Sequence, residues 1–338
     1  MKRIIPVLAA ILVFLLAGCS QVAQHVTGSS LSDTGLEKCR VQMMEFATEG
    51  NFIFSPVSLS TALNIHSKLE PENQKLNKYL DRDYLSYRYD KKYYKSVNRI
   101  WINKDRDIEI PNSIKKYAYR MDMSDSSKAT KEKNDYVAKE TNNFIKKTPT
   151  ILSSDTIFDI MNVLYFKDTW KNGNLSETYE PVPFNGKYSQ SEITMMYANS
   201  EYYYENDSAY VIPLEYEHKN RMLLIYPKRS IEDVSFNGIL ENKVDQQANI
   251  TFPSFECELS FSPDTLTEKL GLDTKVVQTV KIKVDKEGTE AAAVTEDVKD
   301  MAMEPQEQLN LTFDKPFMYA IEDTENGDIA FMGKIEQL

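Results

Sequence analysis

The chain has 338 residues, of which 41% are hydrophobic and 27% charged, and its formal net charge is −11. This composition is typical of a folded globular protein, and it excludes a wholly disordered chain and a small disulfide-bonded scaffold. The excess of acidic residues repels phosphates, and no dense basic cluster offsets it, so we expect no nucleic-acid partner.

The sequence is poor in catalytic motifs. It lacks the G-x-G-x-x-G, G-x-x-x-x-G-K and G-x-S-x-G patterns that are typical of dinucleotide sites, P-loops and α/β-hydrolases. Its three histidines, His25, His66 and His218, form no H-x-x-x-H pair and leave little room for a zinc site or a Ser-His-Asp triad. We therefore predict a protein that is not an enzyme and that uses no cofactor and no metal.

The first residues have the pattern of an export signal. Lys2 and Arg3 precede an apolar run over residues 4–16, which is too short to span a membrane as a helix. The Leu-Ala-Gly-Cys sequence that ends at Cys19 resembles a bacterial lipobox, although a plain signal peptide with an incidental cysteine is the alternative. We predict a signal peptide over 1–18, lipidation of Cys19 and a polar tether over 19–35. The mature protein would be an exported lipoprotein, anchored through its lipid at a bacterial outer membrane or cell surface.

The remaining chain, 36–338, reads as one α+β domain, because helices come mainly early and strands late, without βαβ alternation. Ser55 and Pro56 predict a helix start, and His66 on that helix is expected to be packed rather than a ligand. Further helices are predicted over 113–119 and 131–146, and a short one over 266–270 that is capped by 262–264 and stopped by Gly271. Strands are predicted over 96–102, 158–166, 193–204, 209–216, 222–226, 248–252, 255–261, 276–284, 317–322 and 328–335.

Two cysteines, Cys39 and Cys257, follow Cys19. Cys257 alternates with Phe255, Leu259 and Phe261 on one face of a predicted strand, which indicates a buried structural thiol. A disulfide between Cys39 and Cys257 stays open at this point.

The segment from Lys283 to Gln308 is unusual for a globular domain. A strand leads into Gly288, then into small residues up to Thr295, and then into about 20 residues without apolar periodicity, far more than in most connections. A run of small side chains could slide between two strands, but a short Ala-rich helix and a surface loop would give the same pattern.

The chain resembles the serpin family in several blocks that occur in the expected order. These blocks are N-F-I-F-S-P-V-S over 51–58, N-R-I-W over 98–101, N-V-L-Y-F-K-D-T-W over 162–170, Met195-Met196, E-G-T-E-A-A-A over 287–293, F-D-K-P-F over 313–317 and F-M-G-K over 331–334. The resemblance implies a large central mixed β-sheet with two smaller sheets, surrounding helices and an exposed reactive loop at about 286–308.

The resemblance also implies a suicide inhibitor of serine proteases, and sometimes of cysteine proteases. The target would cleave the loop, and the cleaved loop would insert as a strand before the acyl-enzyme is hydrolysed. The implied hinge consists of Glu287, Gly288, Thr289, Glu290, Ala291, Ala292, Ala293 and Thr295. The implied sheet-opening residues are Ser55, Ser58, Asn162, Gln278 and Trp170, with Trp170 where insertion begins. Gln278 stands where the family often has a histidine, and we expect it to keep the cluster hydrogen-bonded.

Two ways of counting place the reactive bond differently. Counting from Gly288 by the family's spacing places it at Ala302-Met303, with Met301 and Glu304 as neighbours, while counting back from Pro316 differs by about three residues. Small or Met side chains suit elastase-like or subtilisin-like proteases, and Lys299 would suit a trypsin-like one.

Strand parity raises a difficulty for insertion. If Thr289, Ala291, Ala293 and Thr295 face the core, Asp297 and Lys299 must follow on the same face. Burying these charges without partners costs several kcal/mol, so insertion could be slow.

Three classes of function are therefore compared. The first is a tethered, monomeric protease inhibitor, the second a non-inhibitory serpin-fold lipoprotein that binds a partner or serves only as a protease substrate, and the third an exported hydrolase. The small residues over 291–293 argue against the second class, and the missing nucleophile motif argues against the third.

Overall fold

The computed structural model describes residues 32–85, 93–274, 276–289 and 308–338. The predicted signal peptide, Cys19 and the reactive bond at Ala302-Met303 lie outside the described residues. So do the hinge positions from Glu290 to Thr295.

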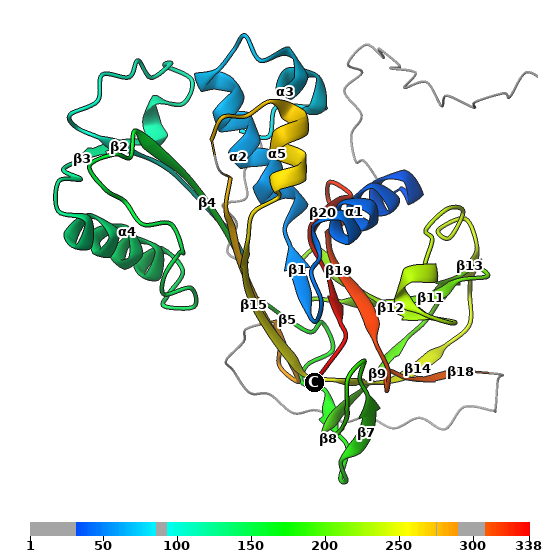
Figure 1. Ribbon diagram of the computed structural model, residues 1–338. Coiled ribbons are helices and arrows are strands. Elements are labelled where there is room, and N and C mark those ends of the chain that lie inside the picture. The colour runs from blue at the N-terminus through cyan, green and yellow to red at the C-terminus, as the bar shows by residue number, and fades with distance from the viewer. Residues whose placement is uncertain (1–31, 86–92, 275, 290–307) are drawn as a thin grey trace, which may run out of the picture.

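The helices lie toward the upper end and one side of the sheets in Figure 1, and local capping explains where several of them begin and end. The helices are α1 (Asp33–Phe46), α2 (Pro56–Leu69), α3 (Gln74–Tyr79), α4 (Ser126–Glu140) and α5 (Asp264–Leu270), with 3-10 turns η1 (Lys115–Tyr117) and η2 (Ile231–Asp233). The Ser55 hydroxyl accepts a hydrogen bond from Ser58 N at 3.1 Å at the start of α2, as the Ser-Pro pair predicts. Gly271 ends α5 with a φ of 68°, which a side chain rarely tolerates. Among the described residues, no helix combines the length and apolar character that crossing a membrane requires.

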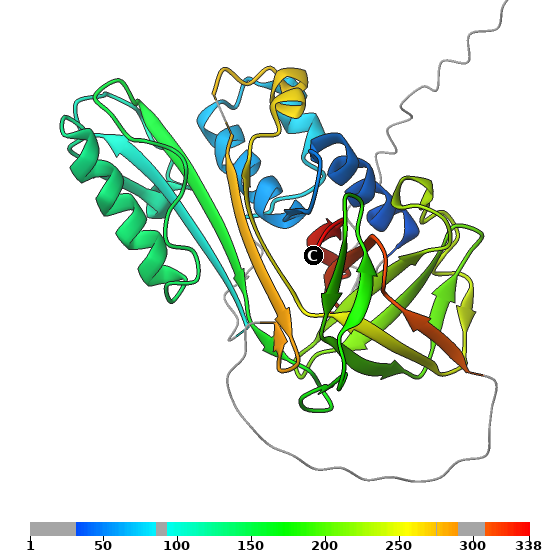
Figure 2. The same cartoon turned by 60° about the horizontal axis from the view of Figure 1, so that its bottom comes forward.

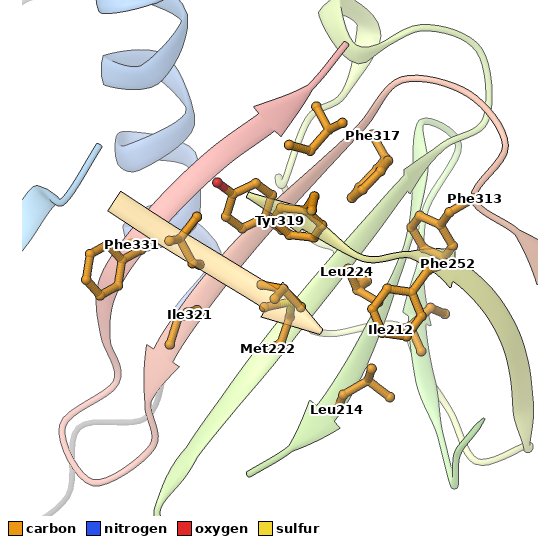
Figure 3. Packing of buried hydrophobic residues seen from close by; sticks show 14 of the residues in the cluster. Ile212, Leu214, Met222, Leu224, Phe252, Phe313, Phe317, Tyr319, Ile321 and Phe331 are labelled. Carbon is orange, nitrogen blue, oxygen red and sulfur yellow. The ribbon is translucent and has the colours of Figure 1, made fainter. Parts of the chain in front are cut away.

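A seven-stranded antiparallel sheet forms the centre of the molecule. Its strands, in spatial order, are β1 (Phe52–Phe54), β20 (Asp328–Ile335), β19 (Phe317–Asp323), β12 (Asn220–Pro227), β11 (Ala209–Glu215), β10 (Tyr203–Glu205) and β13 (Lys243–Val244). Apolar side chains cover both faces. On one face Met222, Tyr319 and Phe331 belong to a large buried cluster that also includes Phe252 from a neighbouring sheet (Figure 3). On the other face α1 packs through Leu36, Cys39 and Met43.

A second, four-stranded sheet lies along one end of the first (Figure 1). Its strands, in spatial order, are β18 (Leu309–Thr312), β14 (Ala248–Pro253), β9 (Met195–Ser200) and β6 (Ser176–Glu177). The hairpin of β7 (Val182–Asn185) and β8 (Gln190–Ile193) projects beside it.

The remaining strands form two sheets that run side by side (Figure 2). One contains β15 (Phe255–Phe261), β16 (Gln278–Asp285), β17 (Gly288–Thr289) and β5 (Asp168–Thr169), and the other β3 (Ala118–Met121), β2 (Tyr94–Asn103) and β4 (Phe158–Phe166). Helix α4 covers one face of β2 and β4 through Ala129 and Val137, and α2 lies against β4 on the other side.

Most predicted strands are confirmed, and β4, β15 and β20 have the predicted bounds. Three predictions are wrong. The strand expected over 193–204 is divided between β9 and β10, which lie in different sheets. The helix expected over 131–146 is α4, which begins five residues earlier because Asp125 caps it and ends at Glu140, before Asn142 and Asn143 with positive φ. The helix expected over 113–119 is a single 3-10 turn followed by β3. The helix α1 was not predicted, and it begins within the expected tether, where Ser32 caps Gly35 N at 3.1 Å.

Candidate functional site

The candidate site is the gap between β4 and β16, the two strands that face each other across the adjoining sheets. Strand β4 pairs with β2 along its whole length, and β16 pairs with β15. Beyond Thr289, the last residue of β17, no described strand pairs with the two edges of β4 and β16 that face each other. Because an unpaired strand edge offers a row of backbone donors and acceptors, this gap can accept another strand.

The hinge end of the gap, which comprises β5, β17, Trp170 and Tyr216, is already filled. Gly288 pairs with Asp285 on one side and with Thr169 on the other, and Thr289 pairs with Val284 and Asp168. Gly288 has a φ of 143°, and a Cβ at this position would lie 2.2 Å from Asp168 O. Only glycine fits so close to a neighbouring backbone in this conformation.

The side chain of Thr289 is buried and hydrogen-bonded to Tyr216. Thr289 is only 1% exposed, and its hydroxyl lies 2.6 Å from the Tyr216 hydroxyl. Burial raises the pKa of Tyr216, so the phenol stays protonated and able to form this bond. The Tyr216 ring stacks on Trp170 at 4.6 Å between centroids, and Trp170 Nε1 donates to Asp285 O at 2.9 Å. The hinge is thus bound by both main-chain and side-chain contacts.

A buried carboxylate supports β5 at this end. Asp168 Oδ2 accepts from Asn220 Nδ2 at 3.0 Å, and Asp168 Oδ1 lies 2.8 Å from His218 Nδ1 and accepts from Thr169 N at 2.9 Å. Its side chain is fully buried, whereas that of His218 is 36% exposed. These bonds fix the backbone of Asp168 against which Gly288 packs.

Four of the predicted sheet-opening residues meet further along the gap, where we call them the polar cluster: Ser55, Ser58, Asn162 and Gln278. Gln278 Nε2 donates to Ser55 O at 2.9 Å, and Gln278 Oε1 accepts from Ser55 N at 2.8 Å. The Ser58 hydroxyl donates to Asn162 Oδ1. The cluster thus ties the start of α2 to both strands that border the gap. Gln278, which stands where the family often has a histidine, is thus hydrogen-bonded to the backbone of Ser55.

An ion pair lies next to the polar cluster and connects α4 to β4. Lys133 Nζ is 3.3 Å from Asp159 Oδ2 and donates to Thr150 O at 2.6 Å, and its side chain is 1% exposed. Burial lowers the pKa of Lys133 and raises the pKa of Asp159. Each charge therefore depends on the other for its stabilisation.

The structure brings together only part of the predicted site. Trp170 lies at the hinge end and not in the polar cluster. Its side chain donates to Asp285 O and its backbone N–H donates to Glu287 O. The resemblance to the family implies that insertion begins at this residue. Glu287, Gly288 and Thr289 are described and lie at this end. Cys39 and Cys257 are free buried thiols, so the possible disulfide between them is absent. Burial raises their pKa values to about 12 and about 11.

Sequence reasoning missed the supports at both ends. Asp168, Asn220 and Tyr216 hold the hinge end, and Asn98 extends the polar cluster by accepting from Asn162 Nδ2. The one available signal was the polar Asp168-Thr169 pair, which follows the apolar end of β4 after Lys167. Among the described residues, no group of three or more His, Cys, Asp or Glu could hold a metal ion.

The comparison with protein families is decisive for the class of protein. The family model described as "Serpin (serine protease inhibitor)" matches residues 39–338. The chain therefore belongs to the serpin family, whose members are mostly protease inhibitors and are generally not enzymes.

Individual relatives are distant. The human leukocyte elastase inhibitor is 25% identical over 237 residues, which cover 56% of this chain and 62% of the relative. The chain spans less than two thirds of the length of the first curated relatives that it matches.

Solved structures share the fold. A thermophilic serpin, tengpin, in its native state has a TM-score of 0.75 at 18% identity and covers 93% of this chain and 96% of its own. Human thyroxine-binding globulin in complex with its ligand has a TM-score of 0.75 at 19% identity and covers 90% and 97%. The predicted serpin fold is confirmed.

Proposed function

We propose that this protein is a suicide inhibitor of serine proteases and, as a second class, of cysteine proteases. The observation that carries the proposal is that β17 already occupies the head of the gap, paired on both edges. A strand continuing from Thr289 would run antiparallel to both β16 and β4.

The observed register says where each inserted residue would lie. Because Thr289 is opposite Val284 and Asp168, Ala291 would come between Ile282 and Phe166. By the same count Ala293 would come between Val280 and Leu164. Methyl groups suit these positions, because both neighbours are buried apolar side chains.

The same count takes Thr295 to the polar cluster, between Gln278 and Asn162. A threonine hydroxyl both donates and accepts, so it can bond to the groups that the incoming strand separates. On the opposite face Glu290 would lie between Lys283 and Lys167, a favourable cross-strand arrangement of opposite charges. The sequence of the hinge thus fits the gap residue by residue.

The catalytic groups that cleave the reactive bond are those of the target protease. Its nucleophile attacks the carbonyl carbon of Ala302, the bond to Met303 nitrogen breaks, and that nitrogen takes the proton that the target's base removed from the nucleophile. Insertion of the hinge then draws the covalently linked target across the sheet before water can hydrolyse the ester of a serine protease or the thioester of a cysteine protease. The gain in free energy comes from pairing the two open strand edges.

The proposed reactive bond, Ala302-Met303 with Met301 and Glu304 as neighbours, favours elastase-like or subtilisin-like targets. The protein would act as a monomer, exported and held at the outer membrane or cell surface by a lipid on Cys19. This placement rests on the sequence pattern alone.

The test is to incubate the mature protein with pancreatic elastase, subtilisin, trypsin and papain, and to analyse the products on denaturing gels and by mass spectrometry. We expect a covalent complex that survives denaturation and a cut after Ala302. A target carrying an alanine in place of its nucleophile is the control and should give neither product.

Cleavage at the same bond without any complex would contradict the trapping mechanism. It would favour a partner-binding serpin, a role that this fold also serves in thyroxine-binding globulin.

A further inference from the structure

The outer face of the sheet formed by β18, β14 and β9 has an unusual chemistry. Along β14 the side chains of Ala248, Ile250 and Phe252 point into the core, which leaves Asn249 and Thr251 on the other face. Although 27% of the chain is charged, none of the described residues that line the hollow on this face is charged.

The exposed side chains stand in two cross-strand rows. Asn310, Asn249 and Asn199 are directly opposite one another on the three strands. The next row consists of Thr312, Thr251 and Tyr197. Directly opposite residues on neighbouring strands point to the same face, so each row forms a ladder of carboxamides or hydroxyls.

These rows line an open hollow of about 530 Å³. Sites for small ligands are typically about 300–1,000 Å³. Tyr197 is 50% exposed, so part of its ring is free to cover a ligand. Asn199 makes no side-chain hydrogen bond to any described residue.

The carboxamides are held in place by one another. Asn249 Nδ2 donates to Gln308 Oε1 at 2.8 Å and to Asn310 Oδ1 at 3.1 Å, and Asn249 Oδ1 accepts from Gln247 Nε2 at 3.1 Å. Gln308 Nε2 in turn donates to Gln247 Oε1 at 3.2 Å. Amides ordered before binding lose less conformational entropy when a ligand arrives, and several of their donors and lone pairs remain open.

We propose that this face binds an uncharged glycan. Each sugar hydroxyl is both donor and acceptor, which matches the paired donor and acceptor of a carboxamide. The ring of Tyr197 offers an apolar surface to the C–H face of a pyranose while its hydroxyl stays in water. No charge has to be desolvated on either side.

Other ligand classes fit less well. An anionic glycan is repelled by a chain with a net charge of −11. A protein partner usually docks on a desolvated apolar centre with several aromatic or Arg anchors. Within the described part of the chain, Tyr197 is the single aromatic residue that lines this hollow.

The test is affinity electrophoresis of the folded protein in native gels that contain dextran, mannan, galactan or heparin. We expect retardation by at least one of the three neutral polysaccharides and none by heparin. Tyr197→Ala should weaken binding about tenfold and Asn249→Ala about fivefold. Tyr188→Ala, which removes another exposed tyrosine (58%) outside this face, is the matched control and should bind as the original protein does.

Thermal unfolding midpoints show that each variant is folded, and Asn310→Ala on the exposed edge strand serves as a second variant. Failure of all three neutral polysaccharides to retard the protein would overturn the proposal. Equal losses in Tyr197→Ala and Tyr188→Ala, or retardation by heparin alone, would overturn it as well. Slower protease trapping in the Tyr197 variant without any glycan binding would assign the face to a protein partner instead.

Discussion

The two ends of the gap between β4 and β16 are held by different means. At the hinge end a short strand, β17, satisfies the backbone of both neighbours. At the polar cluster no described strand lies between β4 and β16, and side chains from α2, β4 and β16 are bonded to one another. The difference teaches where an incoming strand meets resistance. Its first residues, Gly288 and Thr289, are already paired at the hinge end, whereas the residues that follow must break side-chain contacts at the polar cluster.

These contacts are a modest barrier. A neutral hydrogen bond contributes about 0.5–1.5 kcal/mol net, and an incoming Thr295 would replace part of what it breaks. The cluster is therefore suited to keep the gap closed without preventing entry. Four substitutions test this comparison between the two ends.

The largest effect is expected at the ion pair beside the polar cluster. Lys133→Met leaves Asp159, whose side chain is only 15% exposed, without its partner, and the loss of one member of a buried pair costs up to about 3–5 kcal/mol. We expect the free energy of unfolding to fall by this amount in urea titrations. The double variant Lys133→Met/Asp159→Leu, which buries no unpaired charge, should recover most of the loss. A double variant as unstable as the single one would show that packing of α4, and not charge, holds this side of the gap.

The hinge end is tested by Thr289→Arg. The site is buried and apolar on one side, so an arginine there would have to be desolvated without a partner or keep the hinge out of the gap. We expect the rate of complex formation with a target protease to fall about 100-fold or more, since each 1.4 kcal/mol is a factor of ten. The loop should still be cleaved as a substrate.

Thr289→Ser is the matched control, because it keeps the hydroxyl that lies 2.6 Å from Tyr216. It should trap the target as the original protein does. Normal trapping by Thr289→Arg would contradict the proposed insertion at this end.

The sequence predicted those elements around the gap whose pattern lies within one segment, through strand periodicity or a helix cap. The apolar run of β4, the alternation of β15 and the Ser55-Pro56 start of α2 each follow from a single segment. The polar cluster was placed through resemblance, since Ser55, Asn162 and Gln278 are far apart in the chain and no period connects them.

The hinge supports were not predictable in this way. Asp168, Asn220 and Tyr216 come together only because β5, β11 and β12 meet in three dimensions. The helix α1 was missed because its first turn has the Ser, Asp, Thr and Gly composition of a tether, and it is stabilised by packing of Leu36 and Met43 against the central sheet.

A smaller effect is expected from Gln278→Leu. This substitution leaves Ser55 N buried without its partner at 2.8 Å, which costs about 1–3 kcal/mol, whereas Ser55 O keeps the hydrogen bond from Leu59 N at 3.0 Å. We expect a lower thermal unfolding midpoint. Gln278→His should lose less, because a neutral imidazole also offers one donor and one acceptor. Equal stability of Gln278→Leu and the original protein would mean that water replaces the amide and that the cluster does not close the gap.

The smallest effect concerns the far end of the gap and the charges at Asp297 and Lys299, both outside the described residues. By the register of β17, Asp297 would come between Ile160 and Val276, which offer no partner for a carboxylate. Lys299 would come between Phe158 and Thr274, and the ring of His66 contacts both of these residues. Nδ1 of His66 lies 3.8 Å from Oε1 of Glu70, whose side chain is 40% exposed. The carboxylate would therefore be costly to insert, whereas the ammonium group would meet an acidic partner near solvent.

Asp297→Ala should consequently raise the fraction of target that is trapped instead of released, by about two- to fivefold, because insertion no longer desolvates an unpaired charge. Lys299→Ala is the matched control and should leave this fraction nearly unchanged. The measurement is the number of inhibitor molecules consumed for each protease molecule trapped. An equal gain from both substitutions would show that the inserted strand does not keep the register that β17 begins, and the residue-by-residue fit of the hinge to the gap would then fail beyond Thr295.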